Sequence, residues 1–344
     1  GGARRDRTAD LLHAIKTLYP YMFLKVLTYS IVGLSVLVGA EQSVLIQKSE
    51  KIVEYFNKND FKSMHKMFSI EMKEAIPLTQ LEEILSQTSS QYGVIKKKEF
   101  VRYENTYGVF KAEFLKNKSS KEYLSLKISL NEKSEINGLL LAPWIEHPIL
   151  LRNKSNLTLP FEGEWWVFWG GDTKEENYHV VSSAQKGAFD FLIKNQEGKS
   201  FSNEGKANED YYAFGKRIIS PSDGEVVLVV DGVKDNIPGK LNPIYVPGNT
   251  VIIKTDNNEF LFFAHFVKNS IAVSEGQIVK QGDLLGLCGN SGNSSEPHLH
   301  FHIQNVEDMN EATGAKAYFE NILVDGKIKR DYSPIRNEKV RNTN

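Results

Sequence analysis

Apolar residues recur at helical spacing in the first part of the chain. The pattern runs from residue 41 to residue 56, and a polar stretch at 57–60 ends it before a second helical stretch. A third helix is expected after Pro77, with Thr79 as its cap and its end near Gly93. The opening of this region is therefore predicted to be helical.

Beyond Gly93 the spacing changes to alternation of apolar and polar residues, which predicts an antiparallel sheet in segments 94–103, 107–115, 121–130 and 135–142. Helices followed by strands indicate an α+β domain, here over residues 43–145. This order, ending in Ile-Asn-Gly-Leu-Leu at 136–140, resembles the small nuclear-transport-factor-like cone domains that precede catalytic domains in some exported Gram-positive proteins. The domain carries no chemical motif, and we assign it positioning or wall binding.

The remainder of the chain is predicted to be mainly β. The Pro and Asn content of residues 146–162 predicts a linker, and strand-like and turn-like segments follow to about residue 305 without a long helical pattern. We therefore expect a second, mainly β domain over residues 163–328. A length of 344 residues agrees with two domains.

The N-terminal segment predicts export. Lys25 precedes an apolar run from Val26 to Val38, and the small or apolar residues at 38–40 offer a cleavage site, so residues 22–40 are expected to form a signal peptide. The alternative is an uncleaved membrane anchor, because residues 21–40 are about long enough to span a bilayer. Residues 1–21 are interpreted as an over-extended start without a function.

Charge and cysteine content exclude several kinds of partner and site. The 42 basic and 43 acidic residues leave a net charge of -1, so the overall balance does not recruit nucleic acid or an anionic membrane. Cys288 is the single cysteine, which excludes an internal disulfide and any zinc site with two cysteine ligands. Any metal must therefore be held by histidines and carboxylates.

Histidines cluster in the β-rich part of the chain. Five of the eight lie between residues 179 and 302, and three of them alternate with apolar residues in the segment Pro-His-Leu-His-Phe-His at 297–302. Residues two apart on a strand point the same way, so His298, His300 and His302 are predicted to share one face. Catalytic zinc commonly uses three N or O ligands and leaves a position for water, so further ligands are needed. His179 and Asp190 are candidates, although an Asp between apolar neighbours could instead pair with Arg or cap a turn.

Several blocks resemble the lysostaphin-type (LytM-like) zinc metallopeptidases. The segments Gly-Leu-Cys-Gly-Asn-Ser-Gly at 286–292 and Glu-Pro-His-Leu-His-Phe at 296–301 look like the family signature. Supporting blocks occur in order at 215–227, at 262–265 (Phe-Phe-Ala-His) and at 273–286, the last resembling the family's lipoyl-like hairpin. The resemblance covers roughly residues 163–305 and implies a mainly β catalytic domain with an antiparallel sheet.

The same resemblance implies the roles of individual residues. His179, Asp190 and His300 correspond to the Zn²⁺ ligands, and His298 and His265 to the histidines that flank the activated water and the scissile carbonyl. His298 is our choice as general base, while His265 could stabilise the oxyanion or share the proton transfers.

One position departs from the family pattern. The first histidine usually stands four residues before the Asp, where this chain has Lys186, and a protonated Lys cannot be a ligand. Either a longer loop brings His179 to the metal, which we favour, or the site binds no zinc. His302 is an alternative ligand but lies about 7 Å along the strand from His300, so packing or hydrogen bonding is expected of it. Cys288 as a nucleophile is a further alternative, against its expected role as a small buried hydrophobe.

These inferences combine into an exported zinc metalloendopeptidase that hydrolyses peptide bonds in bacterial peptidoglycan stems or cross-bridges through a zinc-activated water. The expected partners are peptidoglycan peptides and not nucleic acid, with possible N-terminal membrane attachment and a secreted or cell-surface location. Two alternatives stay open. A metal-free relative would bind peptidoglycan or regulate another wall hydrolase, and a general zinc peptidase would act on substrates outside the wall.

Overall fold

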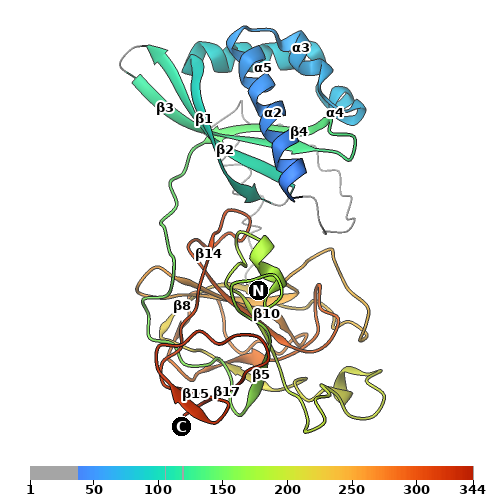
Figure 1. Ribbon diagram of the computed structural model, residues 1–344, viewed down its shortest axis with the longest axis vertical. Coiled ribbons are helices and arrows are strands. Elements are labelled where there is room, and N and C mark those ends of the chain that lie inside the picture. Colours follow the sequence, from blue (N-terminus) through green and yellow to red (C-terminus); the bar gives the residue numbers. More distant parts are fainter. Residues whose placement is uncertain (1–37, 105, 118–119, 344) are drawn as a thin grey trace, which may run out of the picture. The chain divides into compact units, whose positions relative to one another are not determined.

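A computed structural model describes residues 38–104, 106–117 and 120–343, and its contacts divide the chain into two compact units between Glu146 and His147 (Figure 1). The predicted extension at 1–21 and nearly all of the predicted signal segment lie outside the described residues. Within the part that is described, no helix is both long and apolar enough to cross a membrane.

Among the described residues of the N-terminal unit, four helices cover one face of a four-stranded sheet (Figure 1). The helices are α2 (Val38–Asn57), α3 (Phe61–Lys66), α4 (Ile70–Ala75) and α5 (Leu78–Tyr92). Apolar side chains from both layers form the core, and Phe56 on α2 packs edge-on against Phe114 of the sheet with ring centroids 5.7 Å apart. The unit is therefore an α+β domain, as the sequence predicts.

The helix boundaries differ from the prediction at two places. The second helical stretch is divided into α3 and α4, because Ser69 caps a new helix by accepting a hydrogen bond from the amide of Met72 at 3.3 Å. The prediction of Thr79 as the cap of the third helix is wrong. Pro77 occupies the cap position, and its carbonyl accepts the first helical bond from the amide of Leu81, so α5 begins one residue before Thr79.

The sheet of this unit is an antiparallel meander in the order β1-β2-β3-β4. Its strands are β1 (Val94–Glu104), β2 (Tyr107–Asn117), β3 (Ser120–Leu130) and β4 (Ile136–Pro143). They agree with the four predicted segments to within two residues at each end. The alternation identified them because one face packs on the helices, where Phe110, Leu126 and Ile128 are buried.

A large antiparallel sheet organises the C-terminal unit. Its eleven strands follow the order β11-β8-β9-β10-β13-β6-β5-β17-β15-β16, with β14 paired to β13. These strands are β5 (Trp165–Trp169), β6 (Phe189–Leu192), β8 (Gly224–Val230), β9 (Asn249–Lys254), β10 (Phe260–Phe266), β11 (Ile278–Val279), β13 (Leu299–Gln304), β14 (Gly314–Ala315), β15 (Ile322–Val324), β16 (Lys327–Lys329) and β17 (Lys339–Asn342). A separate pair joins β7 (Arg217–Ile219) to β12 (Leu284–Leu287), and two short 3₁₀ helices are η1 (Tyr178–Val181) and η2 (Asn208–Asp210). The predicted mainly β, antiparallel class is confirmed.

The C-terminal unit extends beyond the range expected for the catalytic domain. Leu157, Leu159 and Phe161 are fully buried in its core, so this part of the 146–162 segment packs as part of the unit. At the other end β17 pairs with β5 and adds Val340 to the same core. Glu259 anchors the start of this unit, because its buried carboxylate accepts hydrogen bonds from the amides of Lys154 and Ser155.

Candidate metal centre

β13 supplies the histidine at the centre of the candidate site. The strand lies between β10 and β6, and all six of its residues are buried. Leu299, Phe301 and Ile303 point into the main core, so His300 and His302 lie on the opposite face, as the period of two predicts. His298 comes just before the strand. The structure therefore fixes the imidazole of His300 on a central and fully paired strand.

β6 brings a carboxylate to the same face. Asp190 is the direct backbone partner of His300, and its Oδ1 lies 2.9 Å from Nδ1 of His300. Partners across an antiparallel pair project their side chains to the same side, which explains the contact. Phe189 and Phe191 flank Asp190 and enter the core, so the carboxylate is held by buried neighbours on both sides.

A third group comes from the loop before β6. His179 lies in η1, and its Nε2 is 3.7 Å from Oδ1 of Asp190. Asn177 caps this turn: its Oδ1 faces Nδ1 of His179 at 2.9 Å and accepts the His179 amide at 3.2 Å. The Asn177 amide nitrogen donates to the carbonyls of Gly171 and Ala188, so Oδ1 must be the accepting atom. His179 therefore carries its proton on Nδ1 and presents an unprotonated Nε2 to Asp190.

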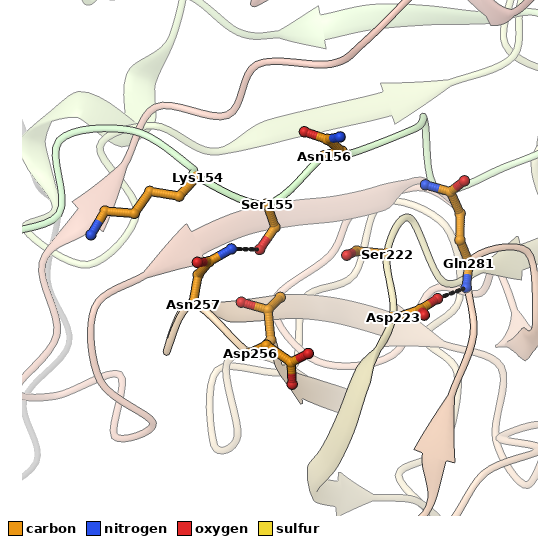
Figure 2. Close-up of a pocket in the computed structure, with 9 residues that line it drawn as sticks. Lys154, Ser155, Asn156, Ser222, Asp223, Asp256, Asn257 and Gln281 are labelled. Atoms are coloured by element: carbon orange, nitrogen blue, oxygen red, sulfur yellow. Dashed lines mark hydrogen bonds between the residues drawn. The ribbon is translucent and has the colours of Figure 1, made fainter.

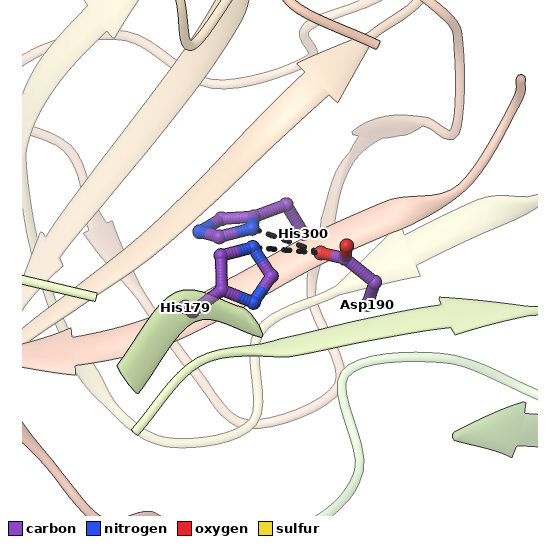
Figure 3. Close-up of side chains that lie close together, drawn as sticks. All are labelled: His179, Asp190 and His300. Atoms are coloured by element: carbon purple, nitrogen blue, oxygen red, sulfur yellow. Dashed lines mark hydrogen bonds and ion pairs between the residues drawn. The ribbon is translucent and has the colours of Figure 1, made fainter. Parts of the chain in front are cut away.

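His179, Asp190 and His300 lie close together (Figure 3), and their donor atoms could hold a zinc ion. Their ligand atoms all lie within 4.8 Å of one another. Zinc binds His N and carboxylate O at about 2.0–2.2 Å, so neighbouring ligand atoms of a tetrahedral site are roughly 3.3 Å apart. The separations of 2.9 and 3.7 Å from Asp190 lie on either side of that value. The donor set of two imidazoles and one carboxylate is also one that catalytic zinc uses.

A bulge in β10 directs His265 to the same face. Ala264 is the backbone partner of His300, so regular alternation would send the next residue into the core. The pairing with β9 shifts between Phe263 and Phe266, and His265 adopts a left-handed φ of 68°. This irregularity turns its ring towards His298, with centroids 4.8 Å apart. Left-handed backbone at a non-glycine residue is strained and concentrates at functional sites.

Backbone carbonyls orient His265 and His298. Ser291 O lies 2.7 Å from Nδ1 of His265, and Glu296 O lies 2.8 Å from Nδ1 of His298. A carbonyl only accepts, so both rings are protonated on Nδ1 and both have an unprotonated Nε2 when neutral. Nε2 of His298 lies 3.6 Å from Oδ1 of Asp190. His298 is also more exposed than His300, with 13% of its side chain accessible against 6%, so it is the better placed to meet a substrate.

Burial and charge set the protonation states of the site. Burial by itself raises the pKa of Asp190, but His179, His298 and His300 outweigh it and hold that pKa well below its usual range. Burial lowers the pKa of His179 to about 4, against an opposing contribution from Asp190. Burial also lowers the pKa of His265 well below its ordinary value, and neighbouring histidines add to this. An ionised Asp190 therefore lies beside a His179 that is neutral at neutral pH, which suits cation binding.

The remaining sequence candidates are also located. Lys186 is exposed, whereas His179 is 2% exposed beside Asp190, so the structure places His179 and not Lys186 at the centre. His302 contacts Nε2 of His300, on the side of that ring away from Asp190. Cys288 is buried, and burial raises the pKa of its thiol far above the usual range, which disfavours a nucleophilic thiolate.

Two residues that form hydrogen bonds with the histidines of the cluster were not identified from the sequence. Asn177 orients His179, and Gln304 continues the hydrogen-bonded row along β13 beyond His302. The spacing in the sequence could have revealed both residues. Gln304 follows His300 and His302 at the same spacing of two, which places it on the same strand face. Asn177 precedes His179 by two residues, the spacing of an Asx-type turn.

A polar hollow lies apart from this centre. It has a volume of about 420 Å³ and is found near the turn between β9 and β10, at the opposite end of β10 from His265. Figure 2 shows its hydrophilic lining, which contains none of the candidate histidines and consists of Lys154, Ser155, Asn156, Ser222, Asp223, Thr255, Asp256, Asn257 and Gln281. The chemistry of the site therefore does not extend to this hollow.

Comparison with protein families identifies two segments. Residues 209–312 match peptidase family M23, and residues 49–139 match a family of unknown function designated DUF3887. The first match contains His265, His298 and His300 and begins after His179 and Asp190.

Individual proteins match over limited lengths. A segment of 56 residues is 39% identical to the peptidoglycan DD-endopeptidase ShyA of Vibrio cholerae and covers 16% of this chain and 13% of that protein. The solution structure of lysostaphin is 20% identical over 37% of this chain and 39% of its own, with a TM-score of 0.25. The catalytic domain of lysostaphin from Staphylococcus simulans is 18% identical over 44% of this chain and 88% of its own, with a TM-score of 0.26. The chain thus spans well under two thirds of the first two proteins.

Proposed function

Because the chain contains a domain of peptidase family M23, we propose that it is a zinc endopeptidase that hydrolyses peptide bonds in peptidoglycan outside the cytoplasm. One observation carries the proposal. Nε2 of His179 and Nε2 of His298 lie within 4 Å of Oδ1 of Asp190, and Nδ1 of His300 lies 2.9 Å from it. This convergence of nitrogens on one buried carboxylate supports a cation site with a base beside it.

His179, Asp190 and His300 would hold the zinc ion. Bound zinc polarises a substrate carbonyl and increases the acidity of water. The protein's own contribution is a rigid frame, since two of these residues are partners on neighbouring strands and the third is held by Asn177. Such support keeps ligand atoms in place without reorganisation during the reaction.

His298 acts as the general base through Nε2. Its Nδ1 proton is held by Glu296 O, which leaves Nε2 as the basic atom on the side of Asp190. It takes the proton of the attacking water and returns it to the departing amine. His265 presents Nε2 in the same way, because Ser291 O occupies its Nδ1 proton. A neutral His265 with this tautomer cannot donate a hydrogen bond to an oxyanion from Nε2, which disfavours the oxyanion role.

The matched relative supports peptidoglycan as the substrate class. ShyA is a peptidoglycan DD-endopeptidase, and a segment of 56 residues of this chain is 39% identical to it. Peptidoglycan lies outside the cytoplasmic membrane, so a wall substrate requires export, in agreement with the apolar segment predicted at 22–40. The DUF3887 domain is proposed to position the catalytic unit or to bind the wall.

The deciding experiment pairs zinc analysis of the purified protein with digestion of isolated peptidoglycan. We expect about one zinc per chain, release of soluble fragments with new amino groups, and loss of both in His300→Ala. Wild-type protein that lacks zinc, releases nothing and sediments with peptidoglycan would instead establish a binding or regulatory protein. Faster cleavage of an unstructured protein such as casein than of peptidoglycan would establish a general peptidase.

A further inference from the structure

A row of hydrogen-bonded side chains continues from His300 along β13, away from Asp190. Nε2 of His300 lies 3.0 Å from Nδ1 of His302, and Nε2 of His302 lies 2.8 Å from Oε1 of Gln304. Gln304 donates from Nε2 to the carbonyls of Val306 and Glu307, each at 2.8 Å. The three residues in the row are at most 5% exposed, so water does not compete for these bonds.

The direction of every bond in this row follows from its far end. Two carbonyls can only accept, so they fix the Gln304 amide with its nitrogen towards them and Oε1 towards His302. Nε2 of His302 must therefore donate. His302 is fully buried, and its ring nitrogens face an imidazole and a carboxamide, so an additional proton on this ring is disfavoured. Its Nδ1 then accepts, and Nε2 of His300 is the donor.

We propose that His302 and Gln304 are positioning residues that hold His300 in the tautomer with an unprotonated Nδ1 facing Asp190 and His179. The inference rests on the proposed function, because the tautomer matters when His300 is a metal ligand. A metal-binding imidazole gains basicity and a fixed orientation from an acceptor on its second nitrogen. His302 is the acceptor here, and Gln304 prevents it from presenting a proton instead.

The surroundings of His302 permit a matched pair of variants. Its ring stacks on Phe262 with centroids 4.5 Å apart and planes 19° apart. His302→Phe keeps an aromatic ring for this stacking and removes both ring nitrogens. His302→Gln loses the ring but keeps an oxygen that accepts from His300 and a nitrogen that donates to Gln304. The two variants therefore separate packing from hydrogen bonding.

The test is the zinc affinity of metal-free protein, measured by competition with a chromogenic chelator, together with the visible spectrum of the Co²⁺-loaded protein. We expect His302→Phe to bind zinc about 10- to 100-fold more weakly and to change the Co²⁺ spectrum. We expect His302→Gln to keep most of the wild-type affinity and the wild-type spectrum. Melting temperatures in chelator verify that the metal-free variants are folded. If His302→Phe does not fold, Gln304→Met replaces it, because it removes the acceptor of His302 one step further along the row.

Other results would overturn the inference. Equal weakening in both variants would assign His302 a packing role, and wild-type affinity in His302→Phe would remove any role towards the metal. Wild-type protein without zinc would overturn the proposed function along with this inference. If the wild type binds zinc and His302→Phe binds it equally well, the positioning role of His302 and Gln304 is overturned and the proposed function is kept.

Discussion

Asp190 and His300 are direct partners on the adjacent strands β6 and β13, and their side-chain atoms Oδ1 and Nδ1 lie 2.9 Å apart. An unprotonated imidazole nitrogen and a carboxylate oxygen at this distance repel each other unless a proton or a metal ion is shared between them. Backbone pairing of two central strands thus imposes a contact that a cation stabilises.

Removing the charge of Asp190 should weaken metal binding while keeping the fold. In Asp190→Asn the side chain keeps its size but loses the anion that offsets the positive charge of zinc. We expect zinc affinity to fall by more than about 100-fold, since loss of supporting residues alone costs 10- to 100-fold. Chelator competition measures the affinity. Unchanged affinity would show that Asp190 is not a ligand.

His179, and not Lys186, should be required for zinc. His179→Ala removes a buried nitrogen 3.7 Å from Asp190, whereas Lys186→Ala shortens an exposed side chain. We expect His179→Ala to lose zinc and peptidoglycan hydrolysis and Lys186→Ala to keep both. Metal analysis and a fragment-release assay provide the two readouts. Zinc retained in His179→Ala, or lost in Lys186→Ala, would require a different ligand set.

His298 should be needed for turnover more than for metal binding. His298→Gln removes the basic Nε2 while leaving His179, Asp190 and His300 in place. General-base catalysis typically contributes about 10²- to 10⁴-fold, so we expect kcat to fall by that factor with zinc content near that of the wild type. Steady-state kinetics on a soluble cross-linked peptide measure the effect. His265→Gln serves as the comparison, and a larger loss there would exchange the two roles.

Metal-free protein should lose stability as the pH falls from about 6.5 towards 4. The folded-state pKa of His179 is lowered to about 4, so the unfolded chain binds more protons than the folded chain in this window. Acidification therefore favours unfolding, by roughly 3 kcal/mol from His179 alone at pH 4. The lowered pKa values of His265 and His302 act in the same direction. Denaturant unfolding in chelator between pH 4 and pH 7 measures the slope.

His179→Ala provides the control for this pH dependence, since it should flatten part of the slope. Unfolding free energy that is constant or rises towards pH 4 would contradict the assigned neutral state of these histidines.

Regular patterns allowed much of the fold to be predicted. Alternation identified the N-terminal strands, and the spacing of two placed His300 and His302 on one face of β13 opposite Leu299 and Phe301. Capping preferences of single residues were less informative. The prediction placed Thr79 at the cap of α5, but Pro77 occupies that position without a side-chain hydrogen bond. Periodicity succeeds where one face is buried, because burial selects the residues.

The positions of His265 and His179 depend on contacts that the periodicity of the sequence does not reveal. Regular alternation would turn His265 away from His300, and only the bulge in β10 brings it to the site. Asn177 holds His179 and is itself fixed by the carbonyls of Gly171 and Ala188, an arrangement that the two-residue spacing alone does not reveal. The family resemblance identified His265 and His179, and the structure provides the physical reason for their placement.

The alternating faces of β13 make the site sensitive to strand register. A slip of one residue against β10 or β6 would exchange the two faces, so that Phe301 would replace His300 opposite Asp190 and the imidazoles would enter the apolar core. A correctly paired sheet is therefore a precondition for collecting the three ligands. If the proposed zinc site is correct, metal uptake during refolding should report that β13 has found its register. A substitution such as Phe301→Ala, which loosens this strand, should then lower the metal content although every ligand is unchanged.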